Sequence, residues 1–254
     1  MAWSSDGRYL FYVIRDAETL LPYKLFRHEI GTSQERDVAI YEEKDTTFYL
    51  SVGNTRSMEY IEVNISSTTS SEVRLIKSDS PDMTPQIFLP REEDHLYSID
   101  HDPASSRFLI ESNWKALNFR LLETDLNNSS DKNKWKELIP HREQVLLQSV
   151  IPFPDHLIIM ERENGLRKLK ILHKESKAVK EINFNDPTYT AYLASNPEYY
   201  VDRFYFGYSS MRTPDSLFSV VLSNGRKRLL KQAEVKGGFS SSDYKVERKF
   251  ITAR

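Results

Sequence analysis

The sequence predicts an all-β protein, a β-propeller with about five blades, each a four-stranded antiparallel sheet. Three observations lead to this prediction. Apolar-rich runs typical of strands follow one another in five groups of about four, at a period of about 40 to 50 residues, which is the spacing of propeller blades. Aromatic residues, which favour strands, make up 12% of the chain. No window shows the sustained 3.6-residue apolar period that indicates a helix.

The groups follow the chain in order, and loops rich in Gly, Pro, Ser, Asn and Asp separate their strands. In the first group the turn-forming run Trp3 to Gly7 leads into the first strand, and we expect nothing before that strand to pair with it. The expected strands are residues 9–14, 24–30, 37–43; 47–52, 58–65, 72–77, 85–90; 96–100, 107–112, 119–125, 135–139; 145–153, 156–163, 166–174, 179–184; and 191–195, 203–209, 217–222, 227–232.

The last group contains the strongest short turn signal of the chain. Ser223-Asn224-Gly225 lies between two apolar-rich runs, and Asn-Gly between such runs is typical of a β-hairpin. After Gly237-Gly238 the pattern changes, and residues 244–253 are expected to begin a new strand. The chain stops within that expected strand, which favours a truncated protein.

Composition limits the classes of function. The chain has 254 residues, 39% of them apolar, enough for one large all-β domain or two ordinary ones. A net charge of −2 argues against nucleic acid or an acidic membrane surface as a partner. There is no cysteine, which excludes disulfides and thiolate zinc sites and fits a reducing compartment. No apolar run approaches the ~18 residues of a membrane-spanning helix, and we expect a cytoplasmic protein.

No residue in the chain is predicted to be catalytic, to bind a cofactor or to bind a metal. The serine elbow G-x-S-x-G of an α/β-hydrolase is absent: Gly31-Thr32-Ser33 is followed by Glu35, and Gly207-Tyr208-Ser209 by Met211, where the second glycine would stand. The six histidines show no metal-ligand spacing. Asp94-His95 and Asp100-His101-Asp102 are expected to be solvated loop residues, and residues 125–131 a polar loop without the order of a calcium site.

Many stretches in collinear order carry a family resemblance that covers essentially the whole chain. They include TLLPYKLFRHEIGT, IYEEKDTTFYLSV, FLPREEDHLYSIDH, MERENGLRKL, GYSSM-x-TPDSLF and LLKQAEV, then Tyr244-x-x-Glu247-Arg248 and Ala253-Arg254. These resemble the oligopeptidase B group of the prolyl oligopeptidase family of serine peptidases. In that family the matching region is the seven-bladed β-propeller and its return into an α/β-hydrolase catalytic domain. The resemblance therefore covers the propeller and not the chemistry.

The resemblance implies that residues 1–235 form a partial propeller whose first blades are missing. It also implies that residues 236–254 form a linker and first strand leading into an absent catalytic domain, the expected partner. A partial propeller must close at lower symmetry, stay open with apolar faces exposed, or pair with another chain.

The intact enzyme would cleave short peptides after Arg or Lys, while the propeller caps the active site and restricts substrate size. This chain, without the catalytic Ser, Asp and His, would be inactive alone. The alternative is a stand-alone propeller remnant that acts as a binding module, or a decayed, inactive gene product.

Charged pairs recur where one strand group passes to the next, at residues 90–93, 140–143 and 161–163. One hypothesis is that these loops line the face that meets the catalytic domain and form ion pairs across it. The other is that they are ordinary surface pairs, worth ~0 to 1 kcal/mol each.

Overall fold

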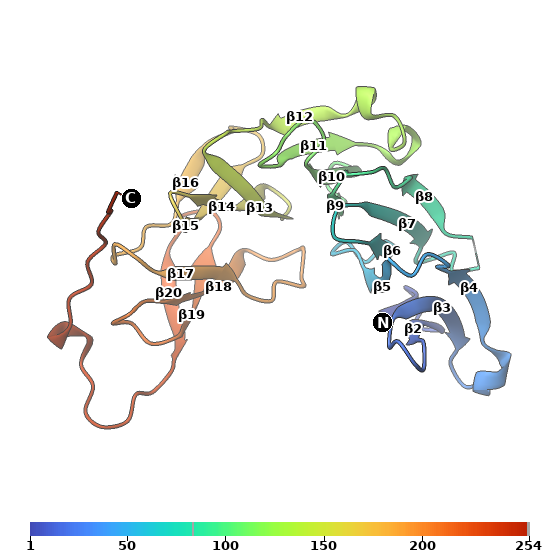
Figure 1. The fold of residues 1–254 in the computed structure, drawn as a ribbon, viewed down its shortest axis with the longest axis horizontal. Coiled ribbons are helices and arrows are strands. Elements are labelled where there is room, and N and C mark those ends of the chain that lie inside the picture. Colours follow the sequence, from blue (N-terminus) through green and yellow to red (C-terminus); the bar gives the residue numbers. More distant parts are fainter. Residues whose placement is uncertain (83, 253–254) are drawn as a thin grey trace. The chain divides into compact units, whose positions relative to one another are not determined.

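The computed structural model, which describes residues 1–82 and 84–252, consists of five four-stranded antiparallel sheets (Figure 1). Within each sheet the strands lie side by side in sequence order. The first two sheets contain β1 (Ala2–Trp3), β2 (Tyr9–Arg15), β3 (Pro22–Glu29), β4 (Val38–Glu42); and β5 (Tyr49–Asn54), β6 (Tyr60–Ser66), β7 (Ser71–Lys77), β8 (Gln86–Leu89). The third contains β9 (Tyr97–Asp102), β10 (Arg107–Ser112), β11 (Arg120–Thr124), β12 (Lys136–Ile139). The last two contain β13 (Val145–Pro152), β14 (His156–Glu163), β15 (Leu166–His173), β16 (Val179–Glu181); and β17 (Thr190–Leu193), β18 (Arg203–Ser209), β19 (Ser216–Val221), β20 (Lys227–Gln232).

The chain divides into two compact units, which are described separately. Unit 1 is Met1–His141 and holds the sheets β1–β4, β5–β8 and β9–β12; unit 2 begins at Arg142 and holds β13–β16 and β17–β20. Helical structure in the described residues is limited to short 3₁₀ turns: η1 (Gln34–Arg36), η2 (Leu126–Asn128), η3 (Lys132–Lys134) and η4 (Ser241–Asp243). None of the described residues forms a helix with the length and apolarity needed to span a membrane.

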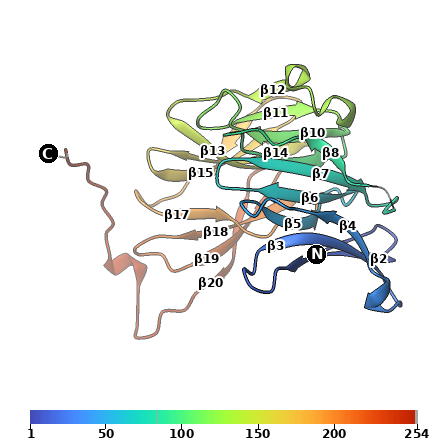
Figure 2. The same ribbon diagram turned by 45° about the vertical axis from the view of Figure 1, so that its right-hand side comes forward.

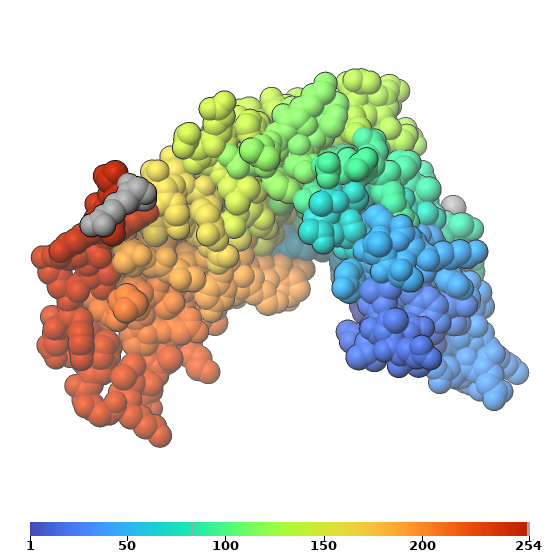
Figure 3. Space-filling model, in the orientation of Figure 1, coloured from blue at the N-terminus to red at the C-terminus, as the bar shows by residue number. Residues whose placement is uncertain are grey.

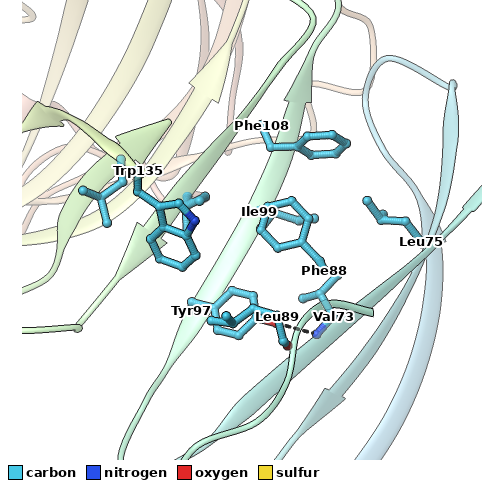
Figure 4. Packing of buried hydrophobic residues seen from close by; sticks show 10 residues of the cluster. Val73, Leu75, Phe88, Leu89, Tyr97, Ile99, Phe108 and Trp135 are labelled. Carbon is cyan, nitrogen blue, oxygen red and sulfur yellow. Dashed lines mark hydrogen bonds between the residues drawn. The ribbon is translucent and has the colours of Figure 1, made fainter. Parts of the chain in front are cut away.

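Unit 1 has two apolar cores because its middle sheet is covered on both faces. Figures 1 and 2 show β5–β8 between the other two sheets of the unit. Ile61, Val63 and Ile65 alternate along β6 and pack with Phe11 and Leu25 of the first sheet. Side chains of β7 and β8 pack on the opposite side against β9, β10 and β11 (Figure 4). The alternation in β6 places its apolar side chains in one core, whereas β7 contributes Val73 and Leu75 to one core and Ile76 to the other, because successive side chains of a strand point to opposite faces.

Unit 2 has one core between its two sheets. Ile158, Leu169 and Ile171 from the first sheet face Phe204 and Phe206 from the second, and all five are buried. The Phe206 and Phe218 rings stack with their centroids 5.2 Å apart, on neighbouring strands β18 and β19. Aromatic pairs of this kind across strands stabilise a sheet beyond the area that they bury.

The prediction of an all-β fold built from four-stranded antiparallel sheets is confirmed. The hairpin at Ser223-Asn224-Gly225 is also confirmed: β19 pairs with β20, and Gly225 has φ +69°, which favours glycine. That these sheets are five of seven propeller blades, and that the propeller ends at residue 235, both stay predictions.

Two strand predictions are wrong. Ala2–Trp3 forms β1 and pairs with Phe11 and Leu10 of β2, so the first expected strand does have a partner on its N-terminal side. The strand expected at residues 244–253 is not formed over 244–252, and residue 253 lies outside the described part. This segment lies on the outside of unit 2 (Figures 1 and 3) without a strand beside it to accept its backbone hydrogen bonds. Its Arg248 guanidinium donates to the Asn164 carbonyl instead.

Candidate functional site

The three charged stretches found in the sequence lie at one end of their sheets, which we call the exit end. It is the end at which the fourth strand of a sheet ends, and in an antiparallel sheet the connection between the second and third strands lies there too. The charged stretches at residues 90–93 and 140–143 follow β8 and β12 and so belong to it. The exit end is therefore the candidate functional site.

In unit 1 the exit ends of the first two sheets are joined by a buried ion cluster around Arg91. The Arg91 Nη2 atom lies 2.5 Å from Glu43 Oε2, and its Nε lies 3.5 Å from Glu72 Oε2. Arg74 Nε donates to Glu72 Oε1 over 2.7 Å, and Tyr41 donates its hydroxyl to Glu43 Oε2 over 2.8 Å. The Glu43 and Glu72 side chains are each only 5% exposed. The cluster ties β4 of one sheet to β7 and β8 of the next.

The protonation of this cluster follows from its contacts. Burial alone would raise the pKa of Glu43, but hydrogen bonds from Arg91, from the Asp45 N–H and from Tyr41 hold that pKa below its usual value. Burial, followed by the hydrogen bond to Glu43, raises the pKa of Tyr41 to about 12. Glu43 is thus the charged partner and Tyr41 the neutral donor at neutral pH.

Unit 2 holds two comparable clusters. Glu161, whose side chain is 3% exposed, binds the Arg142 guanidinium and lies 2.6 Å from Lys170 Nζ. Asp186, which follows β16 and is also 3% exposed, accepts hydrogen bonds from Tyr208 at 2.6 Å and Arg212 at 2.5 Å. Burial alone would raise the pKa of Asp186, but these hydrogen bonds lower it to about 2. Asp186 thereby connects Arg212 of the β18–β19 connection to the segment 182–189, which joins β16 to β17.

These clusters account for part of the charged stretches. Arg91 binds Glu43, and Arg142 binds Glu161, each within its own unit. That the loops also line a face that meets a catalytic domain stays a prediction. The two pairs are not ordinary surface pairs, because the carboxylates are buried. Glu163, which lies 2.6 Å from Lys168 with both side chains about one-third exposed, does fit a surface pair. The Arg91 cluster joins two neighbouring sheets, whereas the Glu161 cluster lies within the sheet β13–β16 and its N-terminal edge.

The serines of the two incomplete elbow motifs, Ser33 and Ser209, do not lie where a catalytic nucleophile would stand. Ser33 caps η1 by accepting a hydrogen bond from the Glu35 N–H at 3.4 Å. Ser209 ends strand β18, and the preceding Gly207 is covered by the Tyr192 ring. Neither serine stands on a strand-to-helix turn, which is the structure that exposes the nucleophile in α/β-hydrolases.

The structure reveals serine–histidine contacts that the sequence did not indicate. His95 Nε2 lies 2.8 Å from Ser112 Oγ, His101 Nδ1 lies 3.0 Å from Ser57 Oγ, and His173 Nδ1 lies 3.1 Å from Ser176 Oγ. Ser112 is fully buried, and the Nδ1 atom of His95 has no partner, so no carboxylate orients that imidazole. This pair lacks the geometry of a catalytic triad. The alternation of His95, Tyr97, Ile99 and His101 at every second position was the available sign of burial.

The expectation that these histidines are solvated loop residues is therefore wrong. His95 is 4% and His101 3% exposed, and His101 packs against the Phe108 ring with centroids 4.8 Å apart. Asp102 is buried as well, whereas Asp94 is exposed as expected. Burial raises the pKa of Asp100 to about 6. These residues lie on or beside β9, the first strand of its sheet, and not in an outer loop.

The burial of His95 gives a testable pH dependence. Burial, with Lys132 nearby, lowers its pKa from 6.5 to about 4. The unfolded chain then binds more protons than the folded chain in this interval, so stability falls as the pH drops from about 6.5 toward 4. In His95→Gln we expect a smaller loss of stability over this interval than in the wild type, measured by urea unfolding at several pH values. Equal losses in the two proteins would contradict the buried, neutral state of His95.

Residues 125–131 form a polar loop, as predicted. Asp125 caps η2 and accepts hydrogen bonds from Asn128, and Asp131 caps η3. One further His–carboxylate pair, His28 Nδ1 with Asp37 Oδ1 at 2.6 Å, lies in the first sheet and was not predicted. Among the residues that the structure describes, no group of three or more His, Cys, Asp or Glu side chains could hold a metal ion.

The comparisons with known proteins agree with the all-β sheets. Residues 1–233 match the family model described as "Prolyl oligopeptidase, N-terminal beta-propeller domain". The whole chain is 35% identical to Protease 2 of Moraxella lacunata and 33% identical to Dipeptidyl aminopeptidase BI of Pseudoxanthomonas mexicana. It spans only 36% and 34% of the length of these relatives.

Solved structures extend the comparison to three dimensions. Oligopeptidase B from Leishmania major superposes with a TM-score of 0.90 and 29% identity, over 99% of this chain and 36% of that protein. The closed form of oligopeptidase B from Trypanosoma brucei, with covalently bound antipain, superposes with a TM-score of 0.86 at 24% identity. The likeness therefore covers about a third of each of these enzymes.

Proposed function

Because the chain belongs to the prolyl oligopeptidase family and matches its N-terminal propeller domain, we propose that it is the substrate-restricting part of an oligopeptidase B-like enzyme. The intact enzyme would cleave short peptides after Arg or Lys in the cytoplasm, by serine attack within an α/β-hydrolase domain. The match to oligopeptidase B over 99% of this chain and 36% of that protein is the observation that carries this proposal.

The propeller's own part in this proposal is steric. Its sheets would be five of the family's seven blades, over residues 1–235, with residues 236–254 leading to the hydrolase domain. The exit ends are where we place the contact with that domain, because the chain leaves β20 there. Ion clusters that hold neighbouring sheets together suit a cap that admits oligopeptides when the domains part and excludes folded proteins.

The alternative proposal is a binding module, or a decayed product, that works without a hydrolase domain. The DNA on both sides of this reading frame separates the two proposals. Continuation into a G-x-S-x-G elbow with its Asp and His would support the peptidase, and eroded sequence with stop codons would support the remnant.

A reconstitution then tests the activity. The chain alone is expected to leave arginyl amide substrates intact, and the chain joined to the continuing hydrolase sequence is expected to cleave them. Release of product by the purified chain alone, with contaminating peptidases excluded by an inhibitor-treated control, would refute the assignment of a non-catalytic part. Activity of the joined protein on neutral amides at the same rate would refute the preference for Arg and Lys.

A further inference from the structure

The small net charge of the chain hides two oppositely charged units. Unit 1 contains 16 Lys and Arg against 24 Asp and Glu, a net charge of −8. From Arg142 onward there are 19 Lys and Arg against 13 Asp and Glu, a net charge of +6. An imbalance of this size within one chain produces electrostatic fields that act over distances longer than direct contacts.

Part of the negative charge of unit 1 lies at the surface without compensation. Glu18, Glu35 and Glu93 are exposed, and none of them forms an ion pair with another described residue. Glu18 and Asp16 line an open groove of about 430 Å³ at the exit end of the first sheet. The other two carboxylates of this groove are paired within the unit, Glu42 with Lys24 and Glu43 with Arg91. Lys44 also lines this groove and contributes a positive charge to it.

We propose that unit 1 attracts cationic oligopeptides, those with several Arg or Lys side chains, by this long-range field before any specific contact forms. The inference rests on the proposed function, in which such peptides are the substrates. It requires no single binding pocket, because the attraction comes from the summed charge of the unit. The positive charge of unit 2 would repel the same peptides, so the attraction is directed to one part of the chain.

Direct binding to the purified chain tests this attraction. The probe is a dansyl-labelled nine-residue peptide with three arginines, and its control is the same peptide with neutral citrulline at those positions. At about 20 mM salt we expect the arginine peptide to bind at least tenfold more tightly, measured by fluorescence anisotropy. This advantage should shrink at about 200 mM salt, where charges are screened within about 7 Å. Equal binding of the two peptides, or no binding of either, would overturn the proposal.

Matched variants locate the effect. The triple substitution Glu18→Gln, Glu35→Gln and Glu93→Gln removes three negative charges from unit 1. The control triple Glu175→Gln, Glu234→Gln and Asp243→Asn removes three from exposed positions of unit 2. We expect the first to weaken binding of the arginine peptide about fivefold at low salt and the second to weaken it much less, because the attraction comes from the field of unit 1. Equal weakening by the two triples would overturn the assignment to unit 1.

This test is independent of catalysis. If the reconstituted enzyme is inactive while the arginine peptide still binds selectively, the proposed function fails and the binding result stands. If the enzyme is active but the peptides bind equally, only the electrostatic inference fails.

Discussion

Replacing Phe108 by alanine is expected to destabilise unit 1 by roughly 3–5 kcal/mol, the usual effect of removing a buried phenylalanine ring. Phe108 on β10 is 1% exposed, and its ring lies 5.2 Å from those of Phe88 and Tyr60. The substitution removes these contacts and leaves a cavity between two sheets. Urea unfolding followed by tryptophan fluorescence measures the effect on unit 1, because all three tryptophans of the chain lie in this unit.

An exposed residue of the same unit provides the control. Leu117, in the β10–β11 connection, is 88% exposed, and Leu117→Ala is expected to change stability by less than about 0.5 kcal/mol. If the two alanine variants unfolded at the same urea concentration, Phe108 would not belong to a packed core between the sheets.

Replacing Arg91 by methionine is expected to destabilise unit 1 by roughly 3–5 kcal/mol, because it leaves the buried Glu43 carboxylate without its positive partner. The Glu43 side chain, which is 5% exposed, would keep only the hydrogen bonds from the Tyr41 hydroxyl and the Asp45 N–H. Glu72, in contrast, would keep its contact with Arg74. The sign of the pH dependence should also change. In the wild type the lowered pKa of Glu43 means that stability is lost as the pH falls, whereas protonation of Glu43 in the variant should relieve the penalty.

The double variant Arg91→Met with Glu43→Gln separates charge from packing. Because it removes one uncompensated carboxylate, we expect it to be more stable than Arg91→Met alone, although each substitution removes wild-type contacts. Arg36→Met is the control for loss of a positive charge, since Arg36 is exposed. Additive losses in the double variant would mean that Arg91 and Glu43 do not interact in solution.

The fold was readable from the sequence because its strands carry local signals. In β6, Ile61, Val63 and Ile65 alternate with polar residues, and Asn224-Gly225 marks the last hairpin. Strand formation still requires a partner, which local signals do not supply. For this reason the two-residue strand β1, Ala2–Trp3, was missed, since its pairing with β2 is not visible in the sequence. For the same reason a strand was expected from Tyr244 onward, where the described residues pair with no other strand.

The ion clusters could not have been predicted from one sequence. Arg91 and Glu43 are 48 residues apart, and nothing local indicates which of many carboxylates an arginine will bind. The burial of His95 and His101 is different, because their two-residue spacing with Tyr97 and Ile99 was visible. The neighbouring aspartates suggested a solvated loop and hid that alternation. The lack of an elbow motif, by contrast, depends on contiguous letters and was evident at once.

Each sheet is complete within a short, uninterrupted part of the chain, because its four strands follow one another in sequence. The protein is therefore organised as a linear array of modules, in which a module depends on its neighbours for packing but not for backbone pairing. A gene rearrangement that removes or duplicates the module β5–β8, with one breakpoint between β4 and β5 and the other between β8 and β9, leaves the hydrogen-bonded ladders of all other modules intact. A break inside a module exposes unpaired strand edges, which invite aggregation. Breakpoints in genes of this kind should accumulate between modules.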